Sequence, residues 1–310
     1  MNILITGGAG YIGSALVNKL ANRMDIDSIV VFDNLSRDNH NLFTQNLQPN
    51  AVGKVRLEYG DILDSRKLRK VMKGIDIVYH LAARTSSPNS DLDSHFYEQT
   101  NHWGTAELIY AVEESTSVKK LIFTSSTAVY GSTQGDDQIT EDTEPNPKTF
   151  YGISKLRGES HVQRLLTSTK TKTLIFRIAN VYGFAPALRF DTVINRFMFD
   201  ANFKNKISIH GSGNQIRSYI HINQVVASLE QALGDDLNAG IYNLSDKQLS
   251  LLDMLDTLKE IYPPMEFIFI NQHITPDHQK IANTAEKNGI LLESKDLMIE
   301  LFTFKQKFTF

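Results

Sequence analysis

Three side chains in the middle of the chain have the types and the spacing of an acid–base group. Tyr151 and Lys155 lie four residues apart in the run YGISK, so on a helix their side chains share one face. Ser126 lies twenty-five residues before Tyr151, in the run TSSTAVYG that ends an apolar segment. An ammonium near a phenol lowers the tyrosine pKa from about 10 and makes tyrosine a usable base near neutral pH. A hydroxyl at Ser126 would then hold the substrate oxygen whose proton Tyr151 removes.

A glycine-rich turn at the start of the chain points to a phosphate-bearing ligand. In NILITGGAGYIGSALVNKL, the residues Gly7, Gly10 and Gly13 separate a strand-like apolar run from a helix-like one. In this context the first glycine allows a tight turn, the second lets the backbone approach a pyrophosphate, and the third lets the helix pack on the strand. The helix N-terminus offers free N–H groups to the phosphates. A Tyr-x-x-x-Lys pair alone is usually a surface feature, and the glycine turn favours the catalytic interpretation.

Carboxylates and small residues follow the next strand-like runs. Asp33 lies twenty residues beyond Gly13, where a carboxylate accepts both ribose hydroxyls of NAD and repels the 2′-phosphate of NADP. Arg37 close by keeps NADP as an alternative cofactor. Asp61 in YGDILD repeats the pattern and is placed to meet an adenine amino group, although taken alone it would be a turn or helix-cap residue. The small residues of HLAA, at 80–83, would let the cofactor pass close to the backbone.

A parallel sheet would bring these residues together, and the first half of the chain has the pattern of one. Short apolar or β-branched runs predict strands at 2–6, 28–32, 55–59, 75–80, 120–124 and 173–177. Longer patterns between them predict helices near 11–22, 64–72, 96–114 and 150–168. This alternation indicates an α/β fold with a Rossmann-type, doubly wound parallel sheet.

The pattern changes after residue 178, where a long irregular segment precedes helix-like runs near 191–201, 223–233 and 251–261. We expect a smaller, C-terminal substrate-binding lobe set across the carboxyl edge of the sheet. The domain prediction is an NAD-binding Rossmann domain at 1–178 and a mainly substrate-binding lobe at 179–310, with about 217–245 returning to the first domain.

Composition excludes several classes of function. The 310 residues carry a net charge of −3 with scattered Lys and Arg, so we expect no nucleic-acid partner. We expect no membrane partner, because no apolar run approaches the roughly 18 residues of a membrane span. The chain has no cysteine, which excludes disulfides, thiol nucleophiles and Cys-ligated metals, and we expect no metal. A cytoplasmic location is the default expectation.

The sequence resembles the extended short-chain dehydrogenase/reductases of the NAD-dependent epimerase/dehydratase type, with UDP-glucose 4-epimerase as the nearest model. The matching motifs occur in order from residue 2 to about 245: TGGAGYIGS, DNLS, GDILD, HLAA, TNHWGTAELI, FTSSTAVYG, YGISK, RIANVYG, GNQIRSYIHI and YNLS. The resemblance implies that Tyr151 is the catalytic base, that Lys155 binds the nicotinamide ribose and tunes Tyr151, and that Ser126 contacts the reacting sugar hydroxyl. It also implies a homodimer formed through the helices predicted at 96–114 and 150–168.

The same resemblance assigns the binding residues. The NAD contacts it implies are Gly7, Gly10, Tyr11, Ile12, Gly13, Asp33, Asn34, Asp61, Ile62, Leu81, Ala82, Ala83, Tyr151 and Lys155. The contacts it implies for a nucleotide-diphosphate sugar are Ser126, Asn180, Val193 and Arg217. Asn180 matches a family asparagine near the diphosphate and Arg217 a family arginine that pairs with it, which agrees with the suitability of a guanidinium for phosphate oxygens.

The residue after Ser126 separates the possible reactions. Dehydratases of this family usually carry an acid there, because eliminating water needs a general acid, whereas this chain has Thr127. The leading hypothesis is therefore NAD-dependent epimerisation of a nucleotide sugar at C4, through a transient keto sugar. The alternatives are an NAD(P)-dependent reductase or dehydrogenase of a sugar or another small carbonyl compound, and a non-catalytic NAD-sensing protein. Ser218, Asn223 and Gln224 stand where the family commonly has acids, which leaves the nucleotide and the sugar open.

Overall fold

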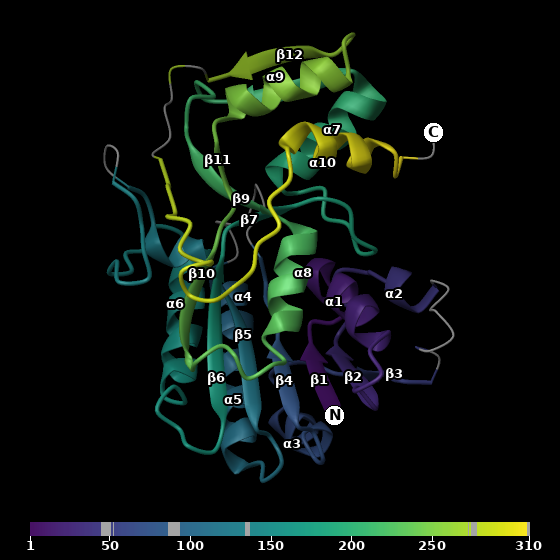
Figure 1. Cartoon of the computed structure of the whole chain (residues 1–310), viewed down its shortest axis with the longest axis vertical. Helices are drawn as coiled ribbons and strands as arrows, with labels where there is room; N and C mark the ends of the chain where they lie inside the picture. Colours follow the sequence, from purple (N-terminus) through teal and green to yellow (C-terminus); the bar gives the residue numbers. More distant parts are fainter. Residues whose placement is uncertain are drawn as a thin grey trace.

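Apolar strands covered on both faces build the main body of the molecule. The computed structural model describes residues 1–44, 51, 53–85, 94–133, 137–271, 273 and 278–308. All of its seven main strands run parallel, in the order β10-β6-β5-β4-β1-β2-β3 (Figure 1). Their bounds are β1 Asn2–Thr6, β2 Ser28–Asp33, β3 Val55–Tyr59, β4 Ile77–His80, β5 Lys120–Ser126, β6 Lys172–Ile178 and β10 Gly240–Leu244. The doubly wound Rossmann-type sheet is thus confirmed, with its order reversing between β1 and β4.

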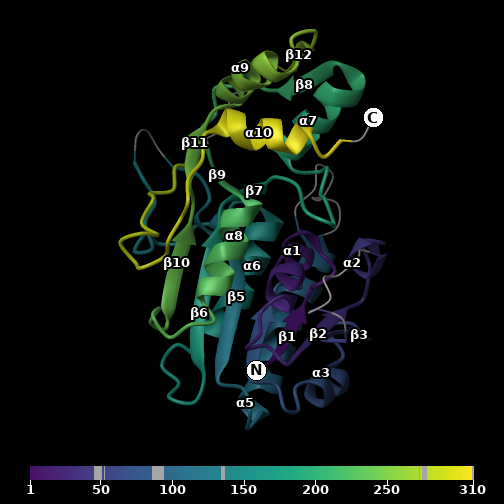
Figure 2. The same ribbon diagram turned by 45° about the vertical axis from the view of Figure 1, so that its right-hand side comes forward.

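Helices cover both faces of this sheet. One face carries α1 (Tyr11–Ala21) and α8 (Ile222–Gln231), whose apolar residues share a core with β1 and β2 (Figure 2). The other face carries α3 (Ser65–Val71), α5 (Gly104–Glu114) and α6 (Phe150–Gln163). Within the described residues, no helix is long and apolar enough to cross a membrane.

Two predicted helices differ from the structure. The helix expected at 96–114 consists of α4 (Ser94–Tyr97), the π-helix η3 (Glu98–Trp103) and α5. The helix expected to reach residue 168 ends at Gln163, because the chain then tightens into successive turns in which each amide bonds three residues back. Amphipathic periodicity locates a helix well but says little about its last turn.

A smaller lobe lies over the carboxyl edge of the sheet, at the top of Figure 1. Its three-stranded sheet has the order β11-β9-β7, and a separate pair joins β8 to β12. Three helices share one apolar core with these strands. The bounds are β7 Asn180–Tyr182, β8 Lys206–His210, β9 Arg217–His221, β11 Lys247–Leu249, β12 Glu266–Ile270, α7 Val193–Lys204, α9 Leu251–Ile261 and α10 Leu297–Lys305. The remaining short helices are α2 (Asn41–Thr44), beside β2, and the 3-10 turn η4 (Thr127–Tyr130) after β5.

Candidate active site

A cavity of about 700 Å³ opens at the carboxyl edge of the sheet, where the smaller lobe meets it. This is the place where open α/β sheets bind ligands, outside the strand ends at the reversal of strand order. The predicted site residues that line the cavity are Gly7, Gly10, Tyr11, Ile12, Gly13, Asp33, Asn34, Asp61, Ile62, Leu81, Ala82, Ala83, Ser126, Tyr151, Lys155, Asn180 and Val193. Arg217 is the exception, because β9 contributes Tyr219 to the described lining instead.

The three glycines of the first turn have three different reasons to be glycine. Gly7 has a φ of +70°, and a Cβ there would lie 2.6 Å from the amide nitrogen of Ala82. A Cβ on Gly13 would lie 2.3 Å from the carbonyl oxygen of Gly7, so only glycine lets α1 start this close to the turn. A Cβ on Gly10 would meet the Gly7 oxygen at 3.2 Å, so the surroundings of Gly10 are looser. Gly10 is also the N-cap of α1 and no side chain caps that end, which leaves helix N–H groups for an anion.

The carboxylates after β2 and β3 are held by backbone and amide groups. The Asp33 Oδ2 accepts from the amide of Ala9, at 3.0 Å, and its Oδ1 accepts from the amide of Leu35, at 2.9 Å. Asn34 Nδ2 donates to Asp61 Oδ2 at 2.9 Å, which joins the two strand ends along one wall of the cavity. Burial raises the pKa of Asp33, and the backbone donors act against that effect. Each Asp33 oxygen keeps a second lone pair for a ligand hydroxyl.

Arg37, the residue that left NADP as an alternative cofactor, already has two polar partners in the structure. Its Nη2 donates to Thr85 Oγ1 at 2.5 Å, and its Nη1 lies 3.7 Å from Asp191 Oδ2 in the smaller lobe. Asp191 also forms an ion pair with Arg189, at 2.8 Å. Both arginines and Asp191 line the cavity.

Ser126 and Tyr151 meet at the other wall of the cavity. Ser126 ends β5, and its Oγ accepts from the amide of Ala128 at 3.2 Å, which starts the turn η4. Tyr151 lies in the first turn of α6, whose N-cap Thr149 accepts from the Gly152 amide at 3.0 Å. The Ser126 hydroxyl lies close enough to the Tyr151 hydroxyl to lower the pKa of that phenol. The two side chains expected from the sequence therefore lie together.

Lys155 lies one turn further along α6, completely buried. Its Nζ donates to the carbonyl oxygen of Thr124 at 2.6 Å and lies 4.4 Å from the centre of the Phe123 ring. Burial lowers the pKa of Lys155 to about 7, and the negative charge of Glu159 opposes that shift. A lysine with such a pKa exchanges its proton near neutral pH.

The pKa of Tyr151 differs from the sequence expectation. Burial raises it above 10, and the groups that lower it are the Ser126 hydroxyl and, more weakly, the charges of Arg189 and Arg37. We expected Lys155 to bring this pKa down, which is not what the structure shows. The physical reason is that loss of water around the phenol outweighs nearby positive charge, while the Lys155 ammonium is directed to the backbone of β5.

Sequence reasoning missed Asn101, which lies in the π-helix η3 beside α6. Its amide exchanges two hydrogen bonds with the backbone of Arg84, at 2.8 and 2.9 Å, and donates to Ser154 Oγ at 2.9 Å. A Cβ on Gly158 would lie 2.3 Å from the Asn101 carbonyl oxygen, so glycine allows α6 to approach η3. The available signal was an asparagine inside a helical pattern three residues before a glycine.

Gln279 was also missed, because it lies in the part of the chain that matches no motif. Its Nε2 donates to the carbonyl oxygens of Thr127 and Gly131, at 3.0 and 2.6 Å, so it fastens the turn that follows Ser126. Ser218, which stands where the family commonly has an acid, donates to the Gln279 carbonyl oxygen at 3.3 Å. No signal in the sequence links residues this far apart.

The fold and the glycine-rich turn together define a class of α/β protein that binds a dinucleotide. Residues 3–245 match the model of the NAD dependent epimerase/dehydratase family, and the chain belongs to that family. The family is NAD-dependent, and NAD is the cofactor. The cavity fits it, because the looser surroundings of Gly10, the uncapped start of α1 and the Asp33 carboxylate lie along one wall.

Known proteins of two activities are similar to this chain. A dTDP-D-glucose 4,6-dehydratase of Dictyostelium discoideum is 33% identical over 271 residues, which cover 81% of this chain and 60% of that protein. A protein of Bacillus subtilis described as an uncharacterized UDP-glucose epimerase is 30% identical, covering 76% of this chain and 73% of its own length. The crystal structure of a UDP-glucuronic acid 4-epimerase from Bacillus cereus, in complex with UDP-glucuronic acid and NAD, is 26% identical with a TM-score of 0.84. It covers 99% of this chain and 98% of its own.

Proposed function

We propose that this enzyme is an NAD-dependent epimerase of a nucleotide sugar and that it acts at C4. The observation that carries the proposal is the Ser126–Tyr151 pair on the cavity wall, with Ser126 followed in the chain by Thr127 and Ala128 rather than by an acid. Elimination of water needs a proton donor for the leaving hydroxyl, whereas epimerisation needs only one group that removes and returns a proton.

The surroundings of Thr127 support this choice. Its side chain is buried, and its Oγ1 lies 3.4 Å from Gln279 Oε1. The Thr127 hydroxyl therefore contacts the C-terminal segment, and Thr127 is not part of the described lining of the cavity. Among the described residues that line the cavity, the carboxylates are Asp33, Asp61 and Asp191. Asp33 and Asp61 line the cavity together with the glycine turn, and Asp191 forms an ion pair with Arg189. None of the three is attached to the strand end that carries Ser126.

The chain would hold the cofactor with the residues already located. The N–H groups at the start of α1 would face the pyrophosphate, Asp33 would accept from the adenosine ribose, and Asp61 would lie near the adenine. Lys155 would bind the second ribose near Tyr151. When bound, NAD takes up a hydride from the sugar carbon and returns it.

The proton is moved by this chain's own side chains. Ser126 Oγ would hold the sugar hydroxyl against Tyr151 Oη, which removes its proton as the carbon is oxidised and returns it when the carbon is reduced. Because burial raises the pKa of Tyr151, the phenolate depends on the nearby Ser126 hydroxyl and on positive charge from Arg189 and Arg37. The keto sugar turns over between the two steps, so the opposite face of the carbon receives the hydride.

The substrate side rests on β7, β9 and the start of α7. Asn180 Nδ2 donates to the carbonyl oxygen of Ser218 at 2.9 Å, and Val193 begins α7 on the cavity wall. Arg217 lies outside the described lining but on the same face of β9 as Tyr219, since alternate residues of a strand share a face. We therefore retain Arg217 as a diphosphate contact at the outer end of the substrate path.

The test is to incubate the protein with NAD and a panel of UDP-, GDP-, CDP- and dTDP-sugars, including uronic acid and N-acetyl forms. Products are separated and weighed while absorbance of NADH is followed. An isomer of unchanged mass without accumulation of NADH is the expected result. Loss of water would make the enzyme a dehydratase, and loss of two hydrogens with stoichiometric NADH would make it a dehydrogenase.

We further propose a homodimer that pairs through η3, α5 and α6. These elements carry large side chains that are partly exposed in the single chain, namely Phe96 beside them, Trp103, Tyr110 and Phe150. Light scattering of the wild-type protein and of Trp103→Glu tests it: a dimer that becomes a monomer supports the proposal, and an unchanged mass rejects it. A cytoplasmic location rests on the absence of cysteine alone.

A further inference from the structure

Three side chains of α6, each four residues apart, contact three successive residues at the end of β5. Tyr151 lies beside Ser126, whose hydroxyl lowers the pKa of the phenol, and Lys155 Nζ donates to the Thr124 carbonyl oxygen at 2.6 Å. The third is Glu159, whose Oε2 accepts from Ser125 Oγ at 2.7 Å. The proposed reaction uses the first two contacts and leaves the third without a role.

Glu159 is part of a buried ion pair. Its carboxylate is 0% exposed and accepts from Nε and Nη2 of Arg177 on β6, with both Nε distances at 3.2 Å. Arg177 is the direct neighbour of Ser125 in the sheet. The carboxylate therefore bridges the strand end that carries Ser126 to the next strand.

The pair continues to the other side of Ser126. Arg177 Nη1 donates to the hydroxyl of Tyr130 at 2.8 Å, and Tyr130 in turn donates to Asn243 Oδ1 on β10 at 2.9 Å. Tyr130 ends the turn η4, whose N-cap is Ser126. Ser126 thus lies in the chain between two anchored residues, Ser125 and Tyr130. Ser125 is hydrogen bonded to Glu159, and Tyr130 is hydrogen bonded to Arg177.

A buried ion pair is a poor way to stabilise a fold. The cost of removing both charges from water often matches or exceeds their attraction, and apolar replacements are frequently as stable. Stability alone therefore does not account for a carboxylate at this position, one helical turn from a buried lysine.

We propose that Glu159 and Arg177 are positioning residues for the reaction. Glu159 keeps Lys155 charged, and the Glu159–Arg177 pair fixes the end of β5 on which Ser126 stands. The catalytic consequence of this inference rests on the proposed function, whereas the expected change in the pKa of Lys155 does not depend on it.

The groups around Lys155 allow the charge effect to be isolated. Glu159, on α6 itself, is the acid whose charge raises the pKa of Lys155 against burial. His80 on β4 has its pKa lowered to about 3, by burial first and by Lys155 second, so it is neutral and stays so. Among the described residues, Tyr151 lies on α6 with Lys155, and Arg177 on β6 is paired with the Glu159 carboxylate. From β5 the neighbours are the Phe123 ring and the Thr124 carbonyl.

The experiment titrates Lys155 in the NAD-loaded enzyme by NMR of ε-¹³C-lysine, with the signal assigned from Lys155→Met. In Glu159→Gln the midpoint is expected to fall by about one unit or more, because the nearest negative charge is gone. Glu159→Asp should recover part of the shift. The matched control is Glu113→Gln, which removes an exposed partner of Arg164 on the same pair of helices. An unchanged midpoint in Glu159→Gln overturns the proposal, whether or not any sugar is turned over.

Activity supplies the second readout, and a double variant guards against misfolding. Glu159→Gln should lower kcat about tenfold or more, and the alkaline limb of its pH profile should move to lower pH with the Lys155 midpoint. A loss of kcat without that movement would indicate a merely structural role and reject the proposal. If Glu159→Gln does not fold, Glu159→Gln combined with Arg177→Met is compared with Arg177→Met alone, so that the two proteins differ only in the carboxylate. A lower Lys155 midpoint in the double variant supports the inference, and equal midpoints reject it.

Discussion

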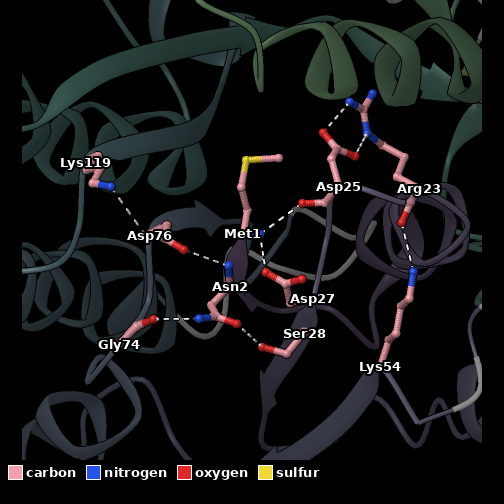
Figure 3. Close-up of polar contacts among 10 residues, drawn as sticks. All are labelled: Met1, Asn2, Arg23, Asp25, Asp27, Ser28, Lys54, Gly74, Asp76 and Lys119. Atoms are coloured by element: carbon pink, nitrogen blue, oxygen red, sulfur yellow. Dashed lines mark hydrogen bonds and ion pairs between the residues drawn. The ribbon is translucent and has the colours of Figure 1, made fainter.

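The two edges of the main sheet use similar polar side chains in opposite ways. Figure 3 shows the amino edge, where the N-terminal amine of Met1 donates to Asp27 Oδ2 at 2.6 Å and Asn2 binds Gly74, Ser28 and Asp76. The ion pair of Arg23 with Asp25, at 2.8 Å, lies there as well, and all of these groups are exposed or partly exposed.

Behind Ser126 at the carboxyl edge, a group of polar side chains is removed from water. Lys155 is buried with a pKa of about 7, and Glu159 and Arg177 are paired without contact with solvent. At the amino edge, the hydrogen bond from Arg23 lowers the pKa of Asp25, the ordinary direction for a carboxylate beside a cation. Polar contacts at the amino edge close the ends of strands, whereas those at the carboxyl edge set the charge state of groups that face the cavity.

The largest contrast is expected for Tyr151→Phe. Removal of the phenolic hydroxyl should lower turnover about a thousandfold, since acid–base groups contribute 10²–10⁴. NAD affinity and thermal stability should stay near the wild-type values. Steady-state kinetics, calorimetric titration with NAD and thermal melting measure the three quantities. Turnover within a factor of ten of wild type would remove Tyr151 from the role of base.

The next largest contrast is expected when one glycine at each edge of the sheet is replaced by alanine. Gly13→Ala places a Cβ 2.3 Å from the Gly7 oxygen and should both destabilise the protein and abolish detectable NAD binding. Gly74→Ala meets no atom within 4 Å but requires a φ of +75°, which costs about 1 kcal/mol and leaves NAD binding unchanged. Chemical denaturation and NAD titration compare the two variants. Equal NAD affinities would contradict the assignment of the turn.

Asp33→Ala should weaken NAD binding about 10- to 100-fold, the effect of losing one or two hydrogen bonds to a charged group. The preference for NAD over NADP should fall at the same time, because the repulsion of a 2′-phosphate is removed. Parallel titrations with both cofactors give the two numbers. If neither affinity changes, Asp33 does not contact the ribose.

The pH dependence should follow Lys155. The charged fraction of Lys155 falls as pH rises through about 7, so activity that needs the ammonium should decline above that value. For stability the sign is opposite: the unfolded lysine keeps its proton to about 10.4. The free energy of unfolding should therefore rise with pH between about 7 and 10 relative to Lys155→Met. Denaturation at pH 6, 8 and 9.5 checks this, and a difference that is flat with pH would contradict the shifted pKa.

The smallest effect is expected at the amino edge. Asp25→Asn should change the free energy of unfolding by less than about 0.5 kcal/mol and leave turnover unchanged, because exposed ion pairs contribute little. Urea denaturation in low and high salt is the measurement. A loss of more than about 1.5 kcal/mol would mean that the two edges are not as different as their exposure indicates.

The parts of the fold that could be predicted from the sequence are those with strong local signals. All six strands expected in the first half occur within three residues of their predicted ends, because continuous apolar runs identify buried parallel strands. β12 and α10 were not predicted: EFIFI is a short run at the edge of a two-stranded pair, and LMIELFTFK is apolar on most of its surface and shows little helical asymmetry. The π-helical η3 depends on contacts with α6 that no local pattern contains.

In the candidate site, too, the residues with strong local signals were the ones that could be predicted. Residues in motifs with fixed spacing, such as Gly7, Tyr151 and Lys155, lie on one cavity as expected. The predicted direction of the Tyr151 pKa shift was wrong, because desolvation depends on everything that surrounds the phenol. The spacing of residues in the sequence carries no information about those surroundings. Gln279 reaches the turn after Ser126 from the far end of the chain, and such contacts are properties of the folded state alone.

The last strand of the main sheet to be synthesised is β10. It is the outer partner of β6, with Gly240 beside Leu174 and Leu244 beside Ile178, so the main sheet is completed only after four of the eight elements of the smaller lobe, namely β7, α7, β8 and β9, have been synthesised. Until then the nascent chain presents the apolar edge of β6, a template for pairing with other chains. A fragment cut anywhere between residues 179 and 239 would keep that edge open, and a soluble NAD-binding half should need residues 240–244 grafted back onto it.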